Sequence, residues 1–141
     1  MRPVVTVLVM TFTIIFTMTF TVANGAMALP SSPVERARIF TDCAGRYAAL
    51  SMHESFFDGA ASEAADARYY LFLDLLEAVR EDAVNDGLPA RHLLHWRIEA
   101  KAAQATLLHR ATFYRDPIVS DTSRQAADAY ISHCNRLLLG S

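Results

Sequence analysis

The segment from residue 65 to residue 83 carries one uninterrupted hydrophobic stripe, which limits the possible folds more than any other feature of this sequence. Its apolar side chains recur at alternating intervals of four and three residues: Ala65, Tyr69, Phe72, Leu76, Val79 and Ala83. This spacing places all six on one face of a helix. Apolar and polar residues do not alternate with a period of two in any part of the chain, which is the pattern of a strand. The sequence therefore predicts an all-α protein without a sheet.

Start and stop signals divide the rest of the chain into helices of similar length. The four expected helices span residues 32–57, 62–85, 89–114 and 120–139. The first begins at the capping box Ser32 to Glu35, with Pro33 at its first helical position. Ser62 is expected to cap the second helix, and Ser120 or Asp121 the fourth. Short connections between such helices predict an up-down-up-down four-helix bundle.

Two cysteines, Cys43 and Cys134, fall on the expected core faces of the first and fourth helices. Antiparallel packing of these helices brings the two positions to within roughly 7–8 Å in height, at ~1.5 Å of rise per residue. An even number of cysteines in an exported chain indicates a disulfide. We therefore expect a Cys43–Cys134 disulfide that joins the first helix to the last; two free buried thiols are the alternative.

The N-terminal segment has the pattern of a secretory signal peptide. Arg2 precedes a run without charge from Val4 to Val22, and Ala26 and Ala28 form the small-x-small pattern that signal peptidase recognises. Cleavage after Ala28 is therefore expected. An uncleaved membrane anchor is the alternative, because the run approaches the ~20 residues that cross a bilayer.

These boundaries give a signal peptide at residues 1–28 and one bundle domain at residues 29–141. The use of twelve arginines and one lysine is typical of a GC-rich bacterial genome, so the expected location is periplasmic or secreted. The net charge is −2, whereas nucleic-acid-binding proteins carry an excess of basic residues. We expect no nucleic-acid partner, and membrane association only if the N-terminal segment stays uncleaved.

One group of residues is a candidate metal site: His92, His95, Glu99 and His133. The first three lie at i, i+3 and i+7 on one side of the third helix, and bundle packing places His133 near the height of His95. Imidazole and carboxylate ligands suit zinc or copper. The spacing is looser than the i, i+4 histidine pair of H-E-x-x-H, so a solvated helix face is the favoured alternative.

A second group, His53, His109 and Glu54, is expected at the opposite end of the bundle, because the first and third helices run parallel. A carboxylate on an apolar stripe needs a partner, and this trio is a catalytic candidate only if a cleft encloses it. The chain has no C-x-x-C-H motif and no glycine-rich phosphate loop. We therefore expect a protein that is not an enzyme and has no resident cofactor.

The third helix is apolar on two sides. The side expected to face the core contains Leu93, Trp96, Ala100, Ala103, Leu107 and Ala111. The other side contains Leu94, Ile98, Ala105 and Leu108. A helix of this kind is either deeply buried or uses one side for a partner. We expect a non-catalytic binding or structural protein, with a protein partner or a second copy on the Leu94 side.

Two segments, FTDCAGRYAAL and WRIEAKAAQATLLHRATF, together with a second cysteine near LLLG, resemble small exported helical proteins of bacteria that have no assigned function. The resemblance covers most of residues 29–141. It implies an exported helical fold, and it implies neither an activity nor a ligand-binding residue.

Overall fold

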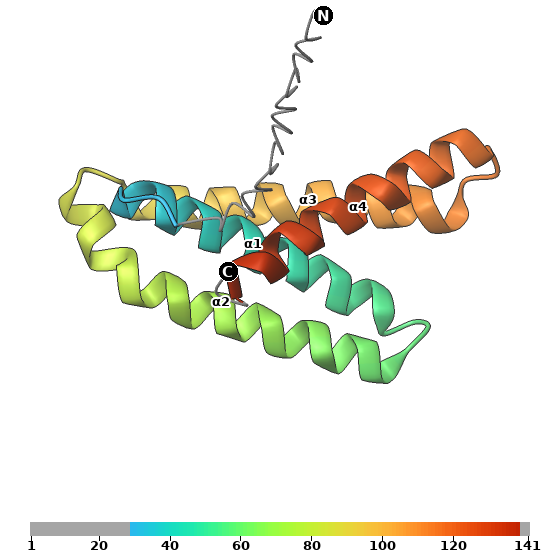
Figure 1. Cartoon of the computed structure of the whole chain (residues 1–141), viewed down its shortest axis with the longest axis horizontal. Coiled ribbons are helices and arrows are strands. Elements are labelled where there is room, and N and C mark those ends of the chain that lie inside the picture. Colours follow the sequence, from blue (N-terminus) through green and yellow to red (C-terminus); the bar gives the residue numbers. More distant parts are fainter. Residues whose placement is uncertain (1–28, 139–141) are drawn as a thin grey trace, which may run out of the picture.

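The computed structural model describes residues 29–138 and consists of four helices joined by short turns (Figure 1). They are α1 (Pro33–Glu54), α2 (Gly59–Asn85), α3 (Ala90–Phe113) and α4 (Pro117–Leu138). No strand occurs among these residues, so the all-α prediction is confirmed. None of the described helices is long and apolar enough to cross a membrane. The expected signal peptide, residues 1–28, lies outside the described range, as does the expected helix end at Leu139.

The central helix is α1, which packs against α2 on one side and α3 on the other. Consecutive helices run in opposite directions, which confirms the up-down-up-down bundle (Figure 1). α4 packs mainly along α3 and touches α1 only over a short length, since it crosses α1 obliquely. The bundle is therefore asymmetric: α1 has neighbours on several sides, whereas α4 is attached at its edge.

The core lies mainly between α1, α2 and the first half of α3. Phe72 is fully buried, and its ring centroid lies 6.4 Å from that of Phe40 and 5.8 Å from that of Tyr47. The expected stripe of α2 faces this cluster, with Ala65 and Leu76 buried above and below Phe72. Burying aromatic rings of this size dominates the hydrophobic stabilisation of a small domain.

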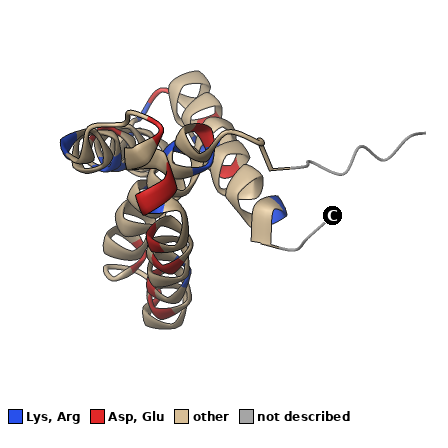
Figure 2. Ribbon diagram, turned by 90° about the vertical axis from the view of Figure 1, so that its left-hand side faces the viewer, with Lys and Arg blue, Asp and Glu red and all other residues tan. Residues whose placement is uncertain are grey.

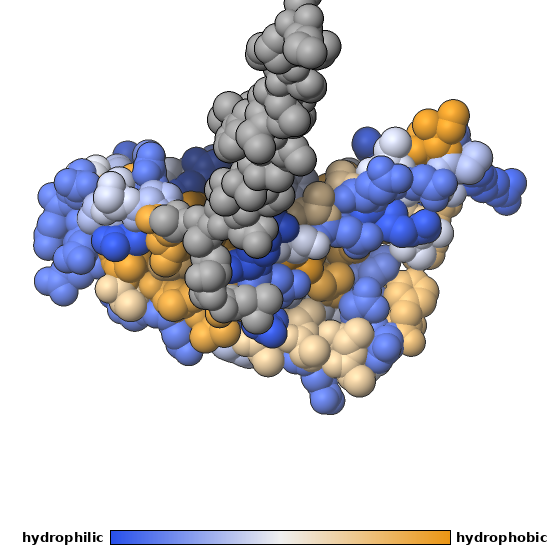
Figure 3. Space-filling model, in the orientation of Figure 1, coloured by the Kyte–Doolittle hydropathy of each residue, from blue (hydrophilic) through white to orange (hydrophobic). Residues whose placement is uncertain are grey.

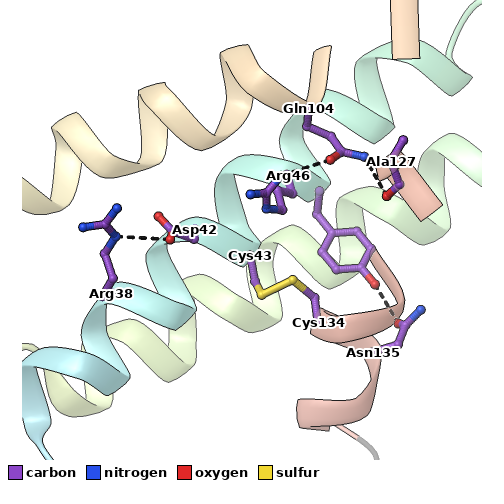
Figure 4. The surroundings of a disulfide bond; sticks show 9 residues. Arg38, Asp42, Cys43, Arg46, Gln104, Ala127, Cys134 and Asn135 are labelled. Atoms are coloured by element: carbon purple, nitrogen blue, oxygen red, sulfur yellow. Dashed lines mark hydrogen bonds and ion pairs between the residues drawn. A yellow bond between two sulfur atoms is a disulfide. The ribbon is translucent and has the colours of Figure 1, made fainter. Parts of the chain in front are cut away.

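The Cys43–Cys134 disulfide is present and joins α1 to α4, as the sequence predicts (Figure 4). The two Cα atoms lie 5.7 Å apart, and both side chains are buried. Beside the disulfide, the Tyr47 hydroxyl donates a hydrogen bond of 2.6 Å to Oδ1 of Asn135 (Figure 4). The C-terminal half of α4 is therefore fixed to α1 by one covalent and one polar contact.

A chain of two hydrogen bonds attaches the middle of α4 to α3 and α1. Nη1 of Arg46 donates to Oε1 of the buried Gln104 at 3.2 Å, and Nε2 of Gln104 donates to the carbonyl of Ala127 at 3.2 Å (Figure 4). The guanidinium of Arg46 lies 3.6 Å from the ring centroid of Tyr130. Burial lowers the pKa of Arg46 from its usual value. The spacing of Tyr130 from Ala127 and Cys134 predicts a core position. Its side chain is 45% exposed instead, because the ring supports this cation.

The helix starts differ from the prediction at two places. α2 begins directly after Asp58, whose Oδ1 accepts a backbone N–H at 3.0 Å, so the prediction that Ser62 caps this helix is wrong. α4 begins with a proline after Asp116, whose Oδ1 accepts backbone N–H groups at 2.9 and 3.3 Å. Neither Ser120 nor Asp121 is therefore the cap. In both cases an aspartate placed earlier in the sequence satisfies the free N–H groups.

Candidate functional site

An apolar groove lies between the C-terminal halves of α1 and α3. Its volume is about 590 Å³, within the roughly 300–1,000 Å³ of typical ligand pockets. The residues that line it are Ala49, Met52, His53, Phe56, Phe57, Lys101, Ala105, Leu108, His109 and Phe113. Almost the entire lining surface is carbon, so the groove suits an apolar occupant.

Gly45 brings the backbones of α1 and α3 into contact at the inner end of the groove. A Cβ atom at this position would lie 2.4 Å from the carbonyl oxygen of Arg97 and 3.0 Å from Cβ of Ala100. Beyond this contact the two helices diverge towards their C-terminal ends (Figure 1). Two small residues, Ala49 and Ala105, line the space that opens. The groove therefore follows from a close helix contact with small side chains next to it.

Aromatic rings gather at the outer end of the groove. The centroids of Phe57 and Phe113 lie 6.5 Å apart, and His53 and His109 each lie 5.1 Å from one of these two rings. Phe56 is 81% exposed. Figure 3 shows hydrophobic side chains on the surface near the turn between α1 and α2, where this cluster begins. Exposed apolar patches of this kind mark interaction sites.

The second apolar side of α3 is divided between the groove and the open surface. Leu94 and Ile98 are 53% and 57% exposed, and Ala105 is also exposed, as expected for a docking strip. Leu108 is buried instead, so its expected exposure is wrong: it packs into the wall of the groove opposite α1. The C-terminal half of the strip thus forms one wall of a groove rather than a flat face.

The structure does not bring together the four candidate metal ligands, His92, His95, Glu99 and His133. Nε2 of His95 lies 3.3 Å from Oε1 of Glu99, while the ring of His92 packs 6.0 Å from that of Trp96. In the described part of the chain, no group of three or more His, Cys, Asp or Glu residues is placed to hold a metal ion. Since zinc takes three or four protein ligands, metal binding here stays a prediction without geometric support.

We expect elemental analysis of the purified protein to find neither zinc nor copper in a 1:1 ratio. An imidazole and a carboxylate that pair on an exposed helix face supply only two ligands, too few for a stable site. Stoichiometric metal that is lost from a His95→Ala variant would contradict this expectation. The matched control is His109→Ala, because His109 lies in the groove and should not change the metal content.

Both histidines of the catalytic candidate line the groove, but Glu54 does not. His53 and His109 line opposite walls, and Nε2 of His53 lies 3.1 Å from Oγ1 of Thr112. Glu54 is partly buried at the end of α1, outside the lining of the groove. The cleft that the catalytic interpretation requires is therefore present, but the carboxylate does not lie in it.

Several groove residues were not singled out from the sequence: Met52, Phe56, Lys101 and Phe113. One signal for two of them was available, because Met52 and Phe56 are large apolar residues that lie off the core stripe of the first helix. That expected stripe consists of Phe40, Cys43, Tyr47, Leu50 and Phe57. The chain matches no protein-family model, no curated protein and no solved structure. Evidence for a function of this chain therefore comes from the geometry of the groove.

Proposed function

We propose that this protein is an exported, non-catalytic binding protein that holds an apolar ligand in the groove between α1 and α3. The groove itself carries the proposal, since it combines a volume of about 590 Å³ with an almost wholly apolar lining. Apolar surface buried there contributes roughly 25 cal/mol per Å². Because two long helices form the walls, the groove is already ordered before a ligand binds. Binding therefore costs little conformational entropy of the protein.

Export is supported by the disulfide and by the N-terminal sequence. Disulfides persist in oxidising compartments and are rare in the cytosol. The segment from Arg2 to Ala28 has the charge and small-residue pattern of a signal peptide. A binding protein that meets its ligand outside the cytosol fits both features.

A role in binding is favoured over catalysis by the surroundings of the groove histidines. General acid–base catalysis needs a titratable group within hydrogen-bond reach of a substrate, usually oriented by a further polar partner. His53 and His109 instead pack against phenylalanine rings, and the polar neighbour of His53 is a hydroxyl, that of Thr112 at 3.1 Å. The expected carboxylate, Glu54, lies outside the groove. The two imidazoles therefore act as part of an aromatic wall.

An Ala105→Trp substitution tests this function, because a large ring on the wall should fill the groove. We expect dodecanol to bind the wild-type protein and to bind Ala105→Trp at least tenfold more weakly in a calorimetric titration. The matched control is Ala103→Trp. Ala103 was expected to face the core, but it is exposed and lies outside the lining of the groove. Equal affinities of both variants and the wild type, or no binding to the wild type, would contradict the proposal.

A protein partner or a second copy on α3 is the second candidate, and the exposure of Leu94 and Ile98 supports it. These side chains lie away from the α1–α3 groove, so occupation of the groove should not affect such a partner. Sedimentation of the wild type and of Ala105→Trp distinguishes the two cases. A dimer that is equally stable in both proteins would favour docking on the Leu94 side.

A further inference from the structure

The charged side chain that lines the groove is a cation. Among the residues that the structure describes, Lys101, His53 and His109 are the titratable ones in its lining, and none of the lining residues is acidic. α3 as a whole carries four basic residues and one acidic residue, although the net charge of the chain is −2. The acidic side chains concentrate on α2, the lowest helix in Figure 2. An anion therefore meets less repulsion at the groove than at the α2 surface.

Lys101 gives the groove a polar end. Its backbone nitrogen lies 3.0 Å from the position of a Cβ at Gly45, which places the residue where α1 and α3 meet. Its side chain is half-buried and belongs to the lining. The aromatic pair Phe57 and Phe113 lies at the other end, about 18 Å further along α3 at ~1.5 Å per residue. The groove thus has a lysine at one end, a pair of aromatic rings at the other and an apolar lining between them.

From this polarity we infer that the groove binds a fatty-acid carboxylate. The carboxylate pairs with the ammonium group of Lys101, and the acyl chain runs between α1 and α3 to the aromatic end. The inference rests on the proposed function, to which it adds the chemical class of the ligand. A half-buried lysine prefers an anionic partner, because part of its hydration is already lost.

A free fatty acid fits the groove better than a bilayer surface does. Proteins that dock on anionic membranes use clusters of four to eight basic residues, whereas the lining contains a single lysine. The groove is also a hollow between two helices, and its apolar lining lies along its walls. One acyl chain fills such a hollow, while a flat bilayer reaches only its rim.

The test compares dodecanoate with dodecanol, both below the concentrations at which they aggregate, on protein purified in the form that its host produces. We expect dodecanoate to bind about tenfold more tightly than dodecanol. Lys101→Met keeps the long side chain and should remove this preference, so that the acid and the alcohol bind with similar affinity. Arg110→Met is the matched control, because it removes a charge from the same helix outside the groove lining. Lengthening the acid by one methylene should tighten binding roughly fourfold until the groove is full.

The outcomes separate this inference from the proposed function. Equal affinity for the acid and the alcohol, or a preference that persists in Lys101→Met, would overturn the inference and leave apolar binding intact. Failure of both ligands to bind would overturn both. Binding to phosphatidylglycerol vesicles but not to dodecanoate would assign the groove to a membrane surface, and a dimer weakened by Ala105→Trp would assign it to a second copy. Circular dichroism of each variant confirms that its helices are retained.

Discussion

Removal of the Cys43–Cys134 disulfide is expected to lower the free energy of unfolding by as much as roughly 4–5 kcal/mol. The bond joins positions 91 residues apart, so its loss restores a large conformational freedom to the unfolded chain. A small domain has a total stability of only about 5–15 kcal/mol. α4 has little burial to compensate, because its buried residues are Ser123, Ala127 and Cys134. The reduced protein should therefore lose the docking of α4 first.

Urea denaturation with and without a reductant measures this loss. The double variant Cys43→Ala, Cys134→Ala is the control, since a reductant should leave its unfolding midpoint unchanged. Hydrogen exchange shows which helix loses its structure first. In the reduced protein, amides of α4 should lose protection before those of α1 and α2. An unchanged midpoint after both thiols are shown to be free would contradict the expectation.

The sequence predicts the helices and the disulfide because both follow from local periodicity. The stripe of α2 repeats every three or four residues, so Phe72 and Leu76 must share one face whatever packs on it. Ser32 caps α1 as expected, with its Oγ accepting the backbone N–H of Glu35 at 3.4 Å. The pairing of Cys43 with Cys134 could be predicted from the directions of the two helices and the rise per residue.

The errors lie where contacts between helices decide the outcome. Ser62 has the right chemistry for a cap, but its hydroxyl donates instead to the carbonyl of Ser51 on α1 at 2.9 Å. Tyr130 has the right spacing for the core, but a cation from another helix occupies the space beside it. A period in the sequence shows which residues share a face, and it does not show which neighbour covers that face.

The groove was less predictable still, because one glycine determines where it begins. Phe56 and Met52 were recognisable as apolar residues outside the core stripe, but nothing local places them opposite α3. The apolar second side of α3 was recognised, and its use as a groove wall was not. That use depends on how closely α1 approaches at Gly45, which is a property of the packed pair of helices.

We expect Gly45→Ala to lower the free energy of unfolding by about 2 kcal/mol. The added Cβ would lie 2.4 Å from the carbonyl oxygen of Arg97, a backbone atom that cannot turn away as a side chain can. Overpacking of this kind costs about 1–3 kcal/mol or more, and the better helix propensity of alanine returns at most ~1 kcal/mol. The urea midpoint should fall, and the melting temperature should drop by roughly 8 °C.

Gly59→Ala is the matched control, because it makes the same chemical change at the first residue of α2. There, apart from the adjoining backbone, no atom of the described residues lies within 4 Å of the added Cβ. Helix propensity alone acts there, so this variant should be as stable as the wild type or more stable. Since the clash at Gly45 is relieved only by moving α3 away from α1, Gly45→Ala should also change the affinity for dodecanol, and Gly59→Ala should not. Equal stability of the two variants would show that the helices adjust without cost at this contact, and that the shape of the groove does not depend on it.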